Sequence, residues 1–159
     1  HTTSYWFTPS PEMINSLMCS QSEIVSGLIG IAYALQHVAS MFLMSDVNDI
    51  DVVIGDIDGE WFVRHGSSGK IASASADVSP VIVRENFEPT IFLFDNYPGG
   101  IGFSDLLFQK HHELIATVKK VITNCPCKHG CPSCIGPVLD YGATAKETAL
   151  KIIEIIEVR

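Results

Sequence analysis

The feature that most restricts how this chain can fold is a long uncharged segment: no Asp, Glu, Lys or Arg occurs between Ile24 and Met44. Just before it, Ser20 and Glu23 have the spacing of a capping box, which predicts a helix that begins there and runs to about Met44. A helix of this length and composition approaches what is needed to span a bilayer. Its flanks are acidic and carry no Lys or Arg anchors, which argues against a membrane span. We therefore predict a buried core helix, in which His37 is a hydrogen-bonded core residue, and no association with a membrane.

Candidate strands, each rich in β-forming residues, lie on both sides of this helix in the sequence. They are residues 2–8, 51–57, 61–65, 80–84 and 90–94. An Asp-Gly pair joins the second and third of them, which predicts a hairpin. The last contains a continuous apolar run, which predicts a central place in the sheet. The Gly, Ser and Ala content of residues 66–79 predicts a flexible loop.

Two more helices are expected toward the C-terminal end. One should follow residue 102 and run to about residue 124, with an apolar stripe made of Phe103, Leu107, Leu114, Val118 and Val121. Thr144 and Glu147 form a second capping box, which predicts a last helix whose core side holds Ala149, Ile152, Ile153 and Ile156. The order of elements predicts an α+β fold, with a small sheet packed with helices and a cysteine-rich loop between the last two helices.

Four of the five cysteines are concentrated in that loop, and the fifth, Cys19, stands alone. The four are Cys125, Cys127, Cys131 and Cys134. Their spacing, Cys-x-Cys-x3-Cys-x2-Cys, supplies the four soft donors of a structural zinc site and leaves no open position for water. Gly130 and Gly136 stand where wrapping the ion calls for positive φ. Lys128 is expected to offset part of the −2 charge that four thiolates leave around Zn²⁺.

Other uses of these cysteines fit part of the same pattern. An iron–sulfur cluster is the main alternative, because it also uses four cysteines, although ferredoxin-type runs place one ligand further away in the sequence. Two disulfides within so short a loop would be tight, and a redox Cys-x-x-Cys pair needs a strand directly before it. An odd, clustered cysteine count fits a reducing compartment, so we expect a cytoplasmic protein.

The charge distribution bears on nucleic-acid binding. A formal net charge of −8 argues against a dedicated nucleic-acid binder, and residues 1–63 contain no Lys or Arg. Lysines and histidines are concentrated in residues 109–130 instead. The candidate nucleic-acid contacts are His112, Lys119, Lys120 and Lys128. A solvated helix face explains the same pattern and is slightly favoured over a DNA-binding surface.

A glycine-rich segment, Asp95 to Gly102, joins the strong strand to the following helix. Gly99, Gly100 and Gly102 could hold a phosphate through backbone N–H groups. The segment matches no known phosphate-binding fingerprint, so a sharp turn that needs positive φ is favoured. Asp95 would then cap the turn or face a neighbouring domain. We find no nucleophile–base or acid–base arrangement, and therefore expect no catalytic residue in this chain.

Two segments together resemble the MrfA zinc-binding domain family. They are the Phe94–Gly102 segment, with its Asp-x-x-Pro-Gly-Gly-x-Gly core, and the four-cysteine loop that follows one helix later. The opening His1-Thr2-Thr3 and the helix through Ala34 to His37 also resemble the family, so the likeness covers nearly the whole chain. In that family the domain sits at the C-terminal end of DEAD/DEAH-box helicases.

The resemblance implies that residues 1–159 form a single zinc-binding accessory domain, with its zinc loop at residues 125–136. The parent would be an ATP-dependent, 3′-to-5′ DNA helicase of superfamily 2 involved in DNA repair. This chain begins at His1 and contains neither a Gly-x-x-x-x-Gly-Lys phosphate loop nor an Asp-Glu-x-His box. We therefore expect it to be a piece of that parent, with ATP and magnesium bound elsewhere, and to hydrolyse no ATP alone.

The implied partners are the helicase cores of the same polypeptide and, through the parent, DNA. The domain would brace the cores or guide a DNA strand. A self-standing zinc-dependent module that binds another protein, and an iron–sulfur or redox domain, remain the alternatives. Metal analysis separates the last of these, and a phosphate loop in the same reading frame separates the first two.

Overall fold

A computed structural model describes residues 2–56, 61–65, 71–73, 87–137 and 142–157 of the chain. The elements, in chain order, are β1 (Ser4–Phe7), α1 (Pro11–Ser16), α2 (Gln21–Leu43), the 3-10 helix η1 (Val47–Asp49), β2 (Ile50–Asp56), β3 (Trp61–His65), β4 (Ile71–Ser73), β5 (Pro89–Asp95), α3 (Phe103–Gln109), α4 (His111–Asn124) and α5 (Ala145–Glu157). The predicted α+β fold is confirmed, with the cysteine loop between α4 and α5.

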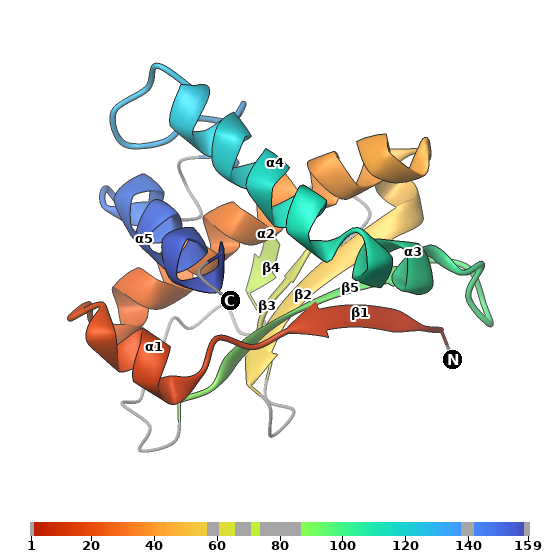
Figure 1. The fold of residues 1–159 in the computed structure, drawn as a ribbon, viewed down its shortest axis with the longest axis horizontal. Helices are drawn as coiled ribbons and strands as arrows, with labels where there is room; N and C mark the ends of the chain where they lie inside the picture. The colour runs from red at the N-terminus through yellow and green to blue at the C-terminus, as the bar shows by residue number, and fades with distance from the viewer. Residues whose placement is uncertain (1, 57–60, 66–70, 74–86, 138–141, 158–159) are drawn as a thin grey trace.

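The sheet has five strands in the order β1-β5-β2-β3-β4, and every neighbouring pair is antiparallel. The predicted hairpin is confirmed, because β2 pairs with β3. The continuous apolar run forms β5, which pairs on one side with β1 and on the other with β2, as the absence of polar alternation suggested. Helices α2, α4 and α5 gather on one side of this sheet and contact one another (Figure 1).

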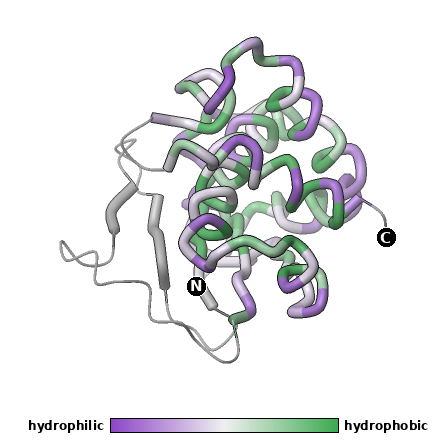
Figure 2. Tube along the Cα trace, turned by 90° about the vertical axis from the view of Figure 1, so that its left-hand side faces the viewer, coloured by the Kyte–Doolittle hydropathy of each residue, from purple (hydrophilic) through white to green (hydrophobic). Residues whose placement is uncertain are grey.

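Helix α2 is the core of the fold. The capping box is present: the Ser20 hydroxyl accepts from the Glu23 N–H at 3.3 Å, and the Ser20 N–H donates to the Glu23 carboxylate at 2.9 Å. By length and composition α2 could cross a membrane, but 72% of its most apolar stretch is buried inside the fold, as in a core helix. It packs against β2 and β5 on one side and against α4 and α5 on the other. Hydrophobic and hydrophilic residues alternate along the helices, as expected where one side of each faces the core (Figure 2).

One residue in the second half of α2, His37, has the opposite environment to the one predicted. His37 is exposed rather than buried; its Nδ1 lies 2.9 Å from the Tyr33 carbonyl oxygen. Its neighbour Gln36 is buried instead, and its amide donates to the carbonyl oxygens of Ile50 at 2.7 Å and Val47 at 3.2 Å. The prediction of a core histidine was therefore wrong, because the helix turns His37 outward and Gln36 toward the start of β2.

The helix predicted to end near residue 124 is two helices. The helical conformation is interrupted at Lys110, where φ is −96° and ψ is 11°. The residues that face the core in α4 therefore do not continue the helical spacing of those in α3. The predicted stripe was consequently wrong at its end: Val121 is 36% exposed. The buried residues of α4 are Leu114, Ile115, Val118 and Ile122.

Three short elements, α1, η1 and β4, were not predicted. Helix α1 begins at Pro11, because proline suits a first helical turn and the Ser10 hydroxyl accepts from the Met13 N–H at 3.4 Å. Strand β4 lies within the segment predicted to be a flexible loop and is held by pairing with β3. The strand predicted at residues 80–84 lies outside the described residues.

Candidate metal centre

The side chains of the four clustered cysteines lie close together just beyond the end of α4. Their sulfur atoms all lie within 4.8 Å of one another, and these four are the one such group of potential metal ligands in the part of the chain that the structure describes. Sulfur–sulfur distances of 3.4 Å join Cys125 to Cys131, 3.5 Å Cys127 to Cys134 and 3.7 Å Cys131 to Cys134. Residues separated by up to nine positions in sequence therefore converge on one small volume.

The distances between the sulfurs distinguish a site for a single metal ion from a site for an iron–sulfur cluster. A tetrahedral ion with Zn–S bonds of about 2.3 Å has sulfur–sulfur edges of about 3.8 Å, close to the distances observed. In an iron–sulfur cluster the cysteines bind different irons and are held further apart by the bridging sulfides. Four sulfurs within 4.8 Å of one another fit a single ion rather than a cluster.

Backbone turns bring the second pair of cysteines together and dock the loop on α2. The N–H groups of Cys134 and Ile135 donate to the Cys131 carbonyl oxygen at 3.0 and 3.1 Å, which forms a tight turn, or knuckle, at the Cys-x-x-Cys pair. Gly136 has φ of 93°, and a Cβ there would lie 3.0 Å from the Tyr33 ring. On α2, a Cβ at Gly30 would lie 2.9 Å from Cβ of Ile135. Both glycines are therefore needed for the loop to lie against α2.

The predicted positive φ at Gly130 is also confirmed, at 118°. The positive charge beside the centre, however, comes from a residue that sequence reasoning missed. Lys128 is exposed, whereas the ammonium group of Lys146 donates to the carbonyl oxygens of Cys125 and Cys127, both at 2.7 Å, and lies 3.5 Å from Sγ of Cys127. A lysine in the first turn of a helix opposes the helix dipole, and this was the signal that could have identified it.

The four thiols are not equivalent when protons occupy the site. A hydrogen bond from Cys125 lowers the pKa of Cys131 to about 7. Burial raises the pKa of Cys134 to about 12. Cys131 is therefore the thiol that ionises most readily, and Cys134 must lose a proton when it becomes a metal ligand.

We expect the apparent affinity for zinc to fall as the pH is lowered, because protons compete with the metal for the thiolates. At neutral pH, binding should release a full proton from Cys134, whose pKa is about 12, and another from Cys125, whose pKa is also raised, but only part of one from Cys131, whose pKa is about 7. A plot of log affinity against pH, from competition with a chelator, should have a slope above one that steepens below the pKa of Cys131. An affinity independent of pH would contradict ligation by these thiols.

The glycine-rich segment forms the predicted sharp turn between β5 and α3. Gly99, Gly100 and Gly102 all have positive φ, at 89°, 74° and 88°. Asp95, 1% exposed, caps this turn: its carboxylate accepts from the Ile101 N–H at 3.1 Å and from the Thr2 hydroxyl at 2.8 Å.

This capping argues against phosphate binding by the same turn. The Gly100 N–H donates to the Tyr97 carbonyl oxygen at 2.9 Å, and the Ile101 N–H is taken by Asp95. A carboxylate thus already occupies the N–H group that a phosphate would use, and it would repel a second anion.

The candidate nucleic-acid contacts are spread along α4 and into the cysteine loop. His112, Lys120 and Lys128 are exposed. Lys119 is engaged in an ion pair, since its Nζ lies 2.7 Å from the Glu157 carboxylate of α5. Three of the four side chains are therefore free to contact a nucleic acid, whereas Lys119 would have to break its ion pair with Glu157 before it could bind a phosphate.

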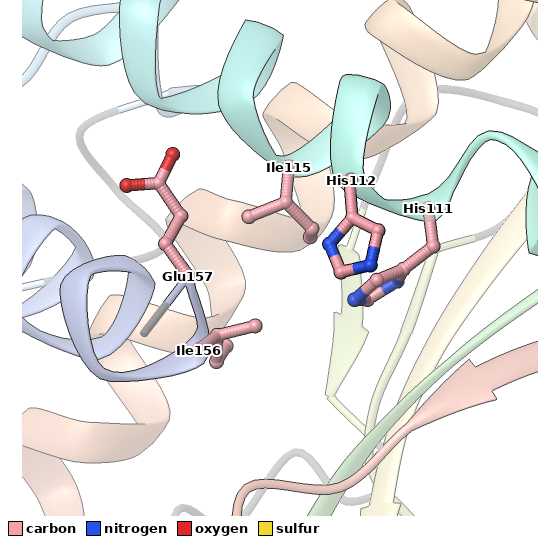
Figure 3. Close-up of a pocket in the computed structure, with 5 residues that line it drawn as sticks. All are labelled: His111, His112, Ile115, Ile156 and Glu157. Atoms are coloured by element: carbon pink, nitrogen blue, oxygen red, sulfur yellow. The ribbon is translucent and has the colours of Figure 1, made fainter. Parts of the chain in front are cut away.

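A surface hollow of about 270 Å³ lies between the start of α4 and the end of α5. It is lined by His111, His112, Ile115, Ile156 and Glu157. Figure 3 shows the two histidine rings close together on one side, with Glu157 on the opposite side. His111 is hydrogen-bonded to the Tyr5 hydroxyl, and burial lowers the pKa of this histidine. The lining of the hollow therefore consists of two imidazole rings, two isoleucines and one carboxylate, and these five residues form no nucleophile–base arrangement.

Comparison with known proteins places these features in context. A model of the family described as the MrfA Zn-binding domain matches residues 31–135. The chain is 35% identical over 127 residues to YprA, an ATP-dependent helicase of Bacillus subtilis (strain 168), a match that covers 80% of this chain and 14% of that helicase.

Two solved structures are also similar. The DUF1998 helicase MrfA bound to DNA matches with a TM-score of 0.65 over 95% of this chain, and the same helicase bound to DNA and AMPPNP with a TM-score of 0.57 over 96%. Both are 29% identical in sequence. This chain spans 16% and 15% of those chains, so it corresponds to a small part of each helicase.

Proposed function

Because the chain belongs to the MrfA Zn-binding domain family, we propose that residues 1–159 form one accessory domain of a larger ATP-dependent DNA helicase, with its zinc loop at residues 125–136. The observation that carries this proposal is the convergence of four cysteine sulfurs within 4.8 Å, in a chain similar to helicases of which it spans only a small share. The chain has no phosphate loop, so ATP and magnesium would be bound by other parts of the polypeptide.

The proposed zinc ligands are Cys125, Cys127, Cys131 and Cys134. When bound, zinc supplies a tetrahedral cross-link and no catalysis, because four protein ligands leave no position for water. The chain's own residues do the positioning: Gly130 and Gly136 turn the loop, and Lys146 holds the carbonyl groups at its beginning. The cross-link ties the end of α4 to the knuckle that lies on α2.

Within the parent we propose that the domain braces the helicase cores. Large apolar side chains are exposed on and beside α3, namely Ile101, Leu106 and Phe108, and Phe108 is 74% exposed. Such side chains suit packing against another part of the polypeptide. A role in DNA repair and a cytoplasmic location belong to the same proposal; the family resemblance supports the first and the free cysteines support the second.

A second candidate function is to guide a DNA strand along α4. The exposed residues His112, Lys120 and Lys128 support it, because they are the concentrated positive surface of an otherwise acidic chain. The ion pair of Lys119 with Glu157 reduces what Lys119 can contribute. The two functions make different predictions for salt dependence.

Changing Lys119, Lys120 and Lys128 together to Ala in the full-length protein is expected to weaken binding of single-stranded DNA and unwinding, and to leave the zinc content intact. For every lysine that no longer neutralises a phosphate, the log–log salt dependence of binding should flatten by about 0.7. The flattening should correspond to Lys120 and Lys128 alone, because Lys119 is already paired with Glu157.

The matched control is Lys151→Ala, which removes a lysine of α5 that is paired with Glu147 and lies outside the α4 face. It should leave the salt slope unchanged. If the triple variant also binds with unchanged affinity and slope, α4 is ordinary surface and the domain acts by bracing alone.

A further inference from the structure

Lys146 is a buried lysine at a position that is unfavourable for a positive charge. It is 7% exposed and is the second residue of α5. Burial of an ammonium group costs free energy unless the charge is paired. The N-terminal end of a helix is also the positive end of its dipole, which adds to the cost. Groups near this lysine must therefore offset both the cost of burying its charge and the repulsion by the helix dipole.

The surroundings of the ammonium group show what offsets them. Two of its three N–H groups donate to the carbonyl oxygens of Cys125 and Cys127 at 2.7 Å, and Sγ of Cys127 lies 3.5 Å away. Neutral carbonyl groups satisfy the hydrogen bonds but do not balance the charge. Four thiolates around Zn²⁺ carry a charge of −2, and that charge would lie directly beside Lys146.

The position of Lys146 also links two elements that are distant in sequence. The carbonyl groups it binds are at the beginning of the cysteine loop, whereas Lys146 begins the helix that follows the loop. One turn further on, α5 packs closely on α2: a Cβ at Gly27 would lie 3.0 Å from the Ala149 backbone nitrogen. The start of α5 is therefore held between the core helix and the proposed metal centre.

We propose that Lys146 is the positioning residue and counter-charge of the zinc centre, and that it makes the attachment of α5 to the loop depend on metal occupancy. This inference rests on the proposed zinc function. With zinc bound, the lysine balances part of the −2 charge and keeps the first two ligands in place. With zinc removed, the four sulfurs are no longer held together beside the buried ammonium group, so the start of α5 is the part of the fold that separates from the loop.

The test uses the full-length protein and measures zinc release to a chromophoric chelator. Lys146→Met removes the charge and the hydrogen bonds, and Lys146→Gln removes the charge but keeps an N–H donor. Both variants are expected to bind zinc about 10–100-fold more weakly than the unmodified protein, the usual effect of removing a partner of the ligands. Lys128→Gln, an exposed lysine within the same loop, is the matched control and should release zinc normally.

A second readout separates a charge effect from simple packing. Replacing zinc with Co²⁺ gives a sulfur-to-cobalt charge-transfer band, which should move to longer wavelength in both Lys146 variants, because sulfur electrons are less stabilised without the nearby cation. A residue that only fills space would leave this band in place. If Lys146→Met does not fold, Lys146→Gln carries the test.

Normal zinc release and an unshifted cobalt band in Lys146→Gln would overturn the inference while leaving the zinc proposal standing. Absence of zinc from the unmodified protein would instead overturn the zinc proposal, so the two failures are distinguishable. The dependence on metal occupancy can be tested by amide hydrogen exchange after a chelator has removed the zinc. Exchange should increase first at the start of α5. An equal increase across α2 and α5 would contradict the proposed coupling.

Discussion

Replacing Cys131 with Ser is expected to abolish zinc binding and to unfold the loop between α4 and α5. In comparable structural sites the apparent zinc-binding free energy of about 10–16 kcal/mol becomes folding free energy, so loss of even part of it exceeds the roughly 1 kcal/mol effect of an average substitution. Elemental analysis should fall from about one zinc per chain to none. Thermal unfolding should show that a chelator destabilises the unmodified chain and has little further effect on the variant.

The control for this change is Cys19→Ser, because Cys19 is half-buried and is not a member of the four-sulfur group. It should retain zinc and respond to the chelator as the unmodified chain does. Retention of zinc by Cys131→Ser would remove this cysteine from the proposed ligand set. Iron in place of zinc in the unmodified chain would favour an iron centre with the same four ligands.

Replacing Asp95 with Ala should cause the second large loss, of about 3 kcal/mol in the free energy of unfolding, because hydrogen bonds to a buried charged group contribute about 1.5–3 kcal/mol each. The Asp95 carboxylate accepts from Thr2 of the N-terminal segment and from Ile101 of the turn before α3. Its removal leaves the Ile101 N–H without its acceptor, and the Thr2 hydroxyl keeps only the backbone carbonyl oxygen of residue 95, 3.0 Å away. Chemical denaturation of the unmodified and variant chains measures the difference.

Asp105→Ala is the matched control, since Asp105 is an exposed aspartate in the first turn of α3. It should cost less than about 1 kcal/mol, the contribution of one charge near a helix dipole. Asp95→Asn should fall between the two, because the amide keeps one acceptor oxygen but loses the charge. Equal effects of the Asp95 and Asp105 changes would show that the cap at the turn contributes little.

The predictions that were confirmed depended on signals local in sequence. The capping box at Ser20 located the start of α2, and the uncharged segment that follows could be stable only where it was buried. The apolar run of β5 required a neighbour on both sides, and the cysteine spacing required the four sulfurs to converge. The positive φ of Gly136 could likewise be predicted from the local sequence, because only the absence of a side chain at that position is required.

The sequence by itself therefore determined the class of fold, the buried helix and the cysteines that converge, because capping, hydrophobic burial and thiolate chemistry act over a few residues. The tertiary structure alone decided that α3 and α4 separate at Lys110, that Gln36 rather than His37 faces the core, and that Lys146 rather than Lys128 lies beside the sulfurs. Each of these depends on which residues of distant segments pack together. A side chain's charge is known from its identity, but the group it stabilises is known only once the chain has folded.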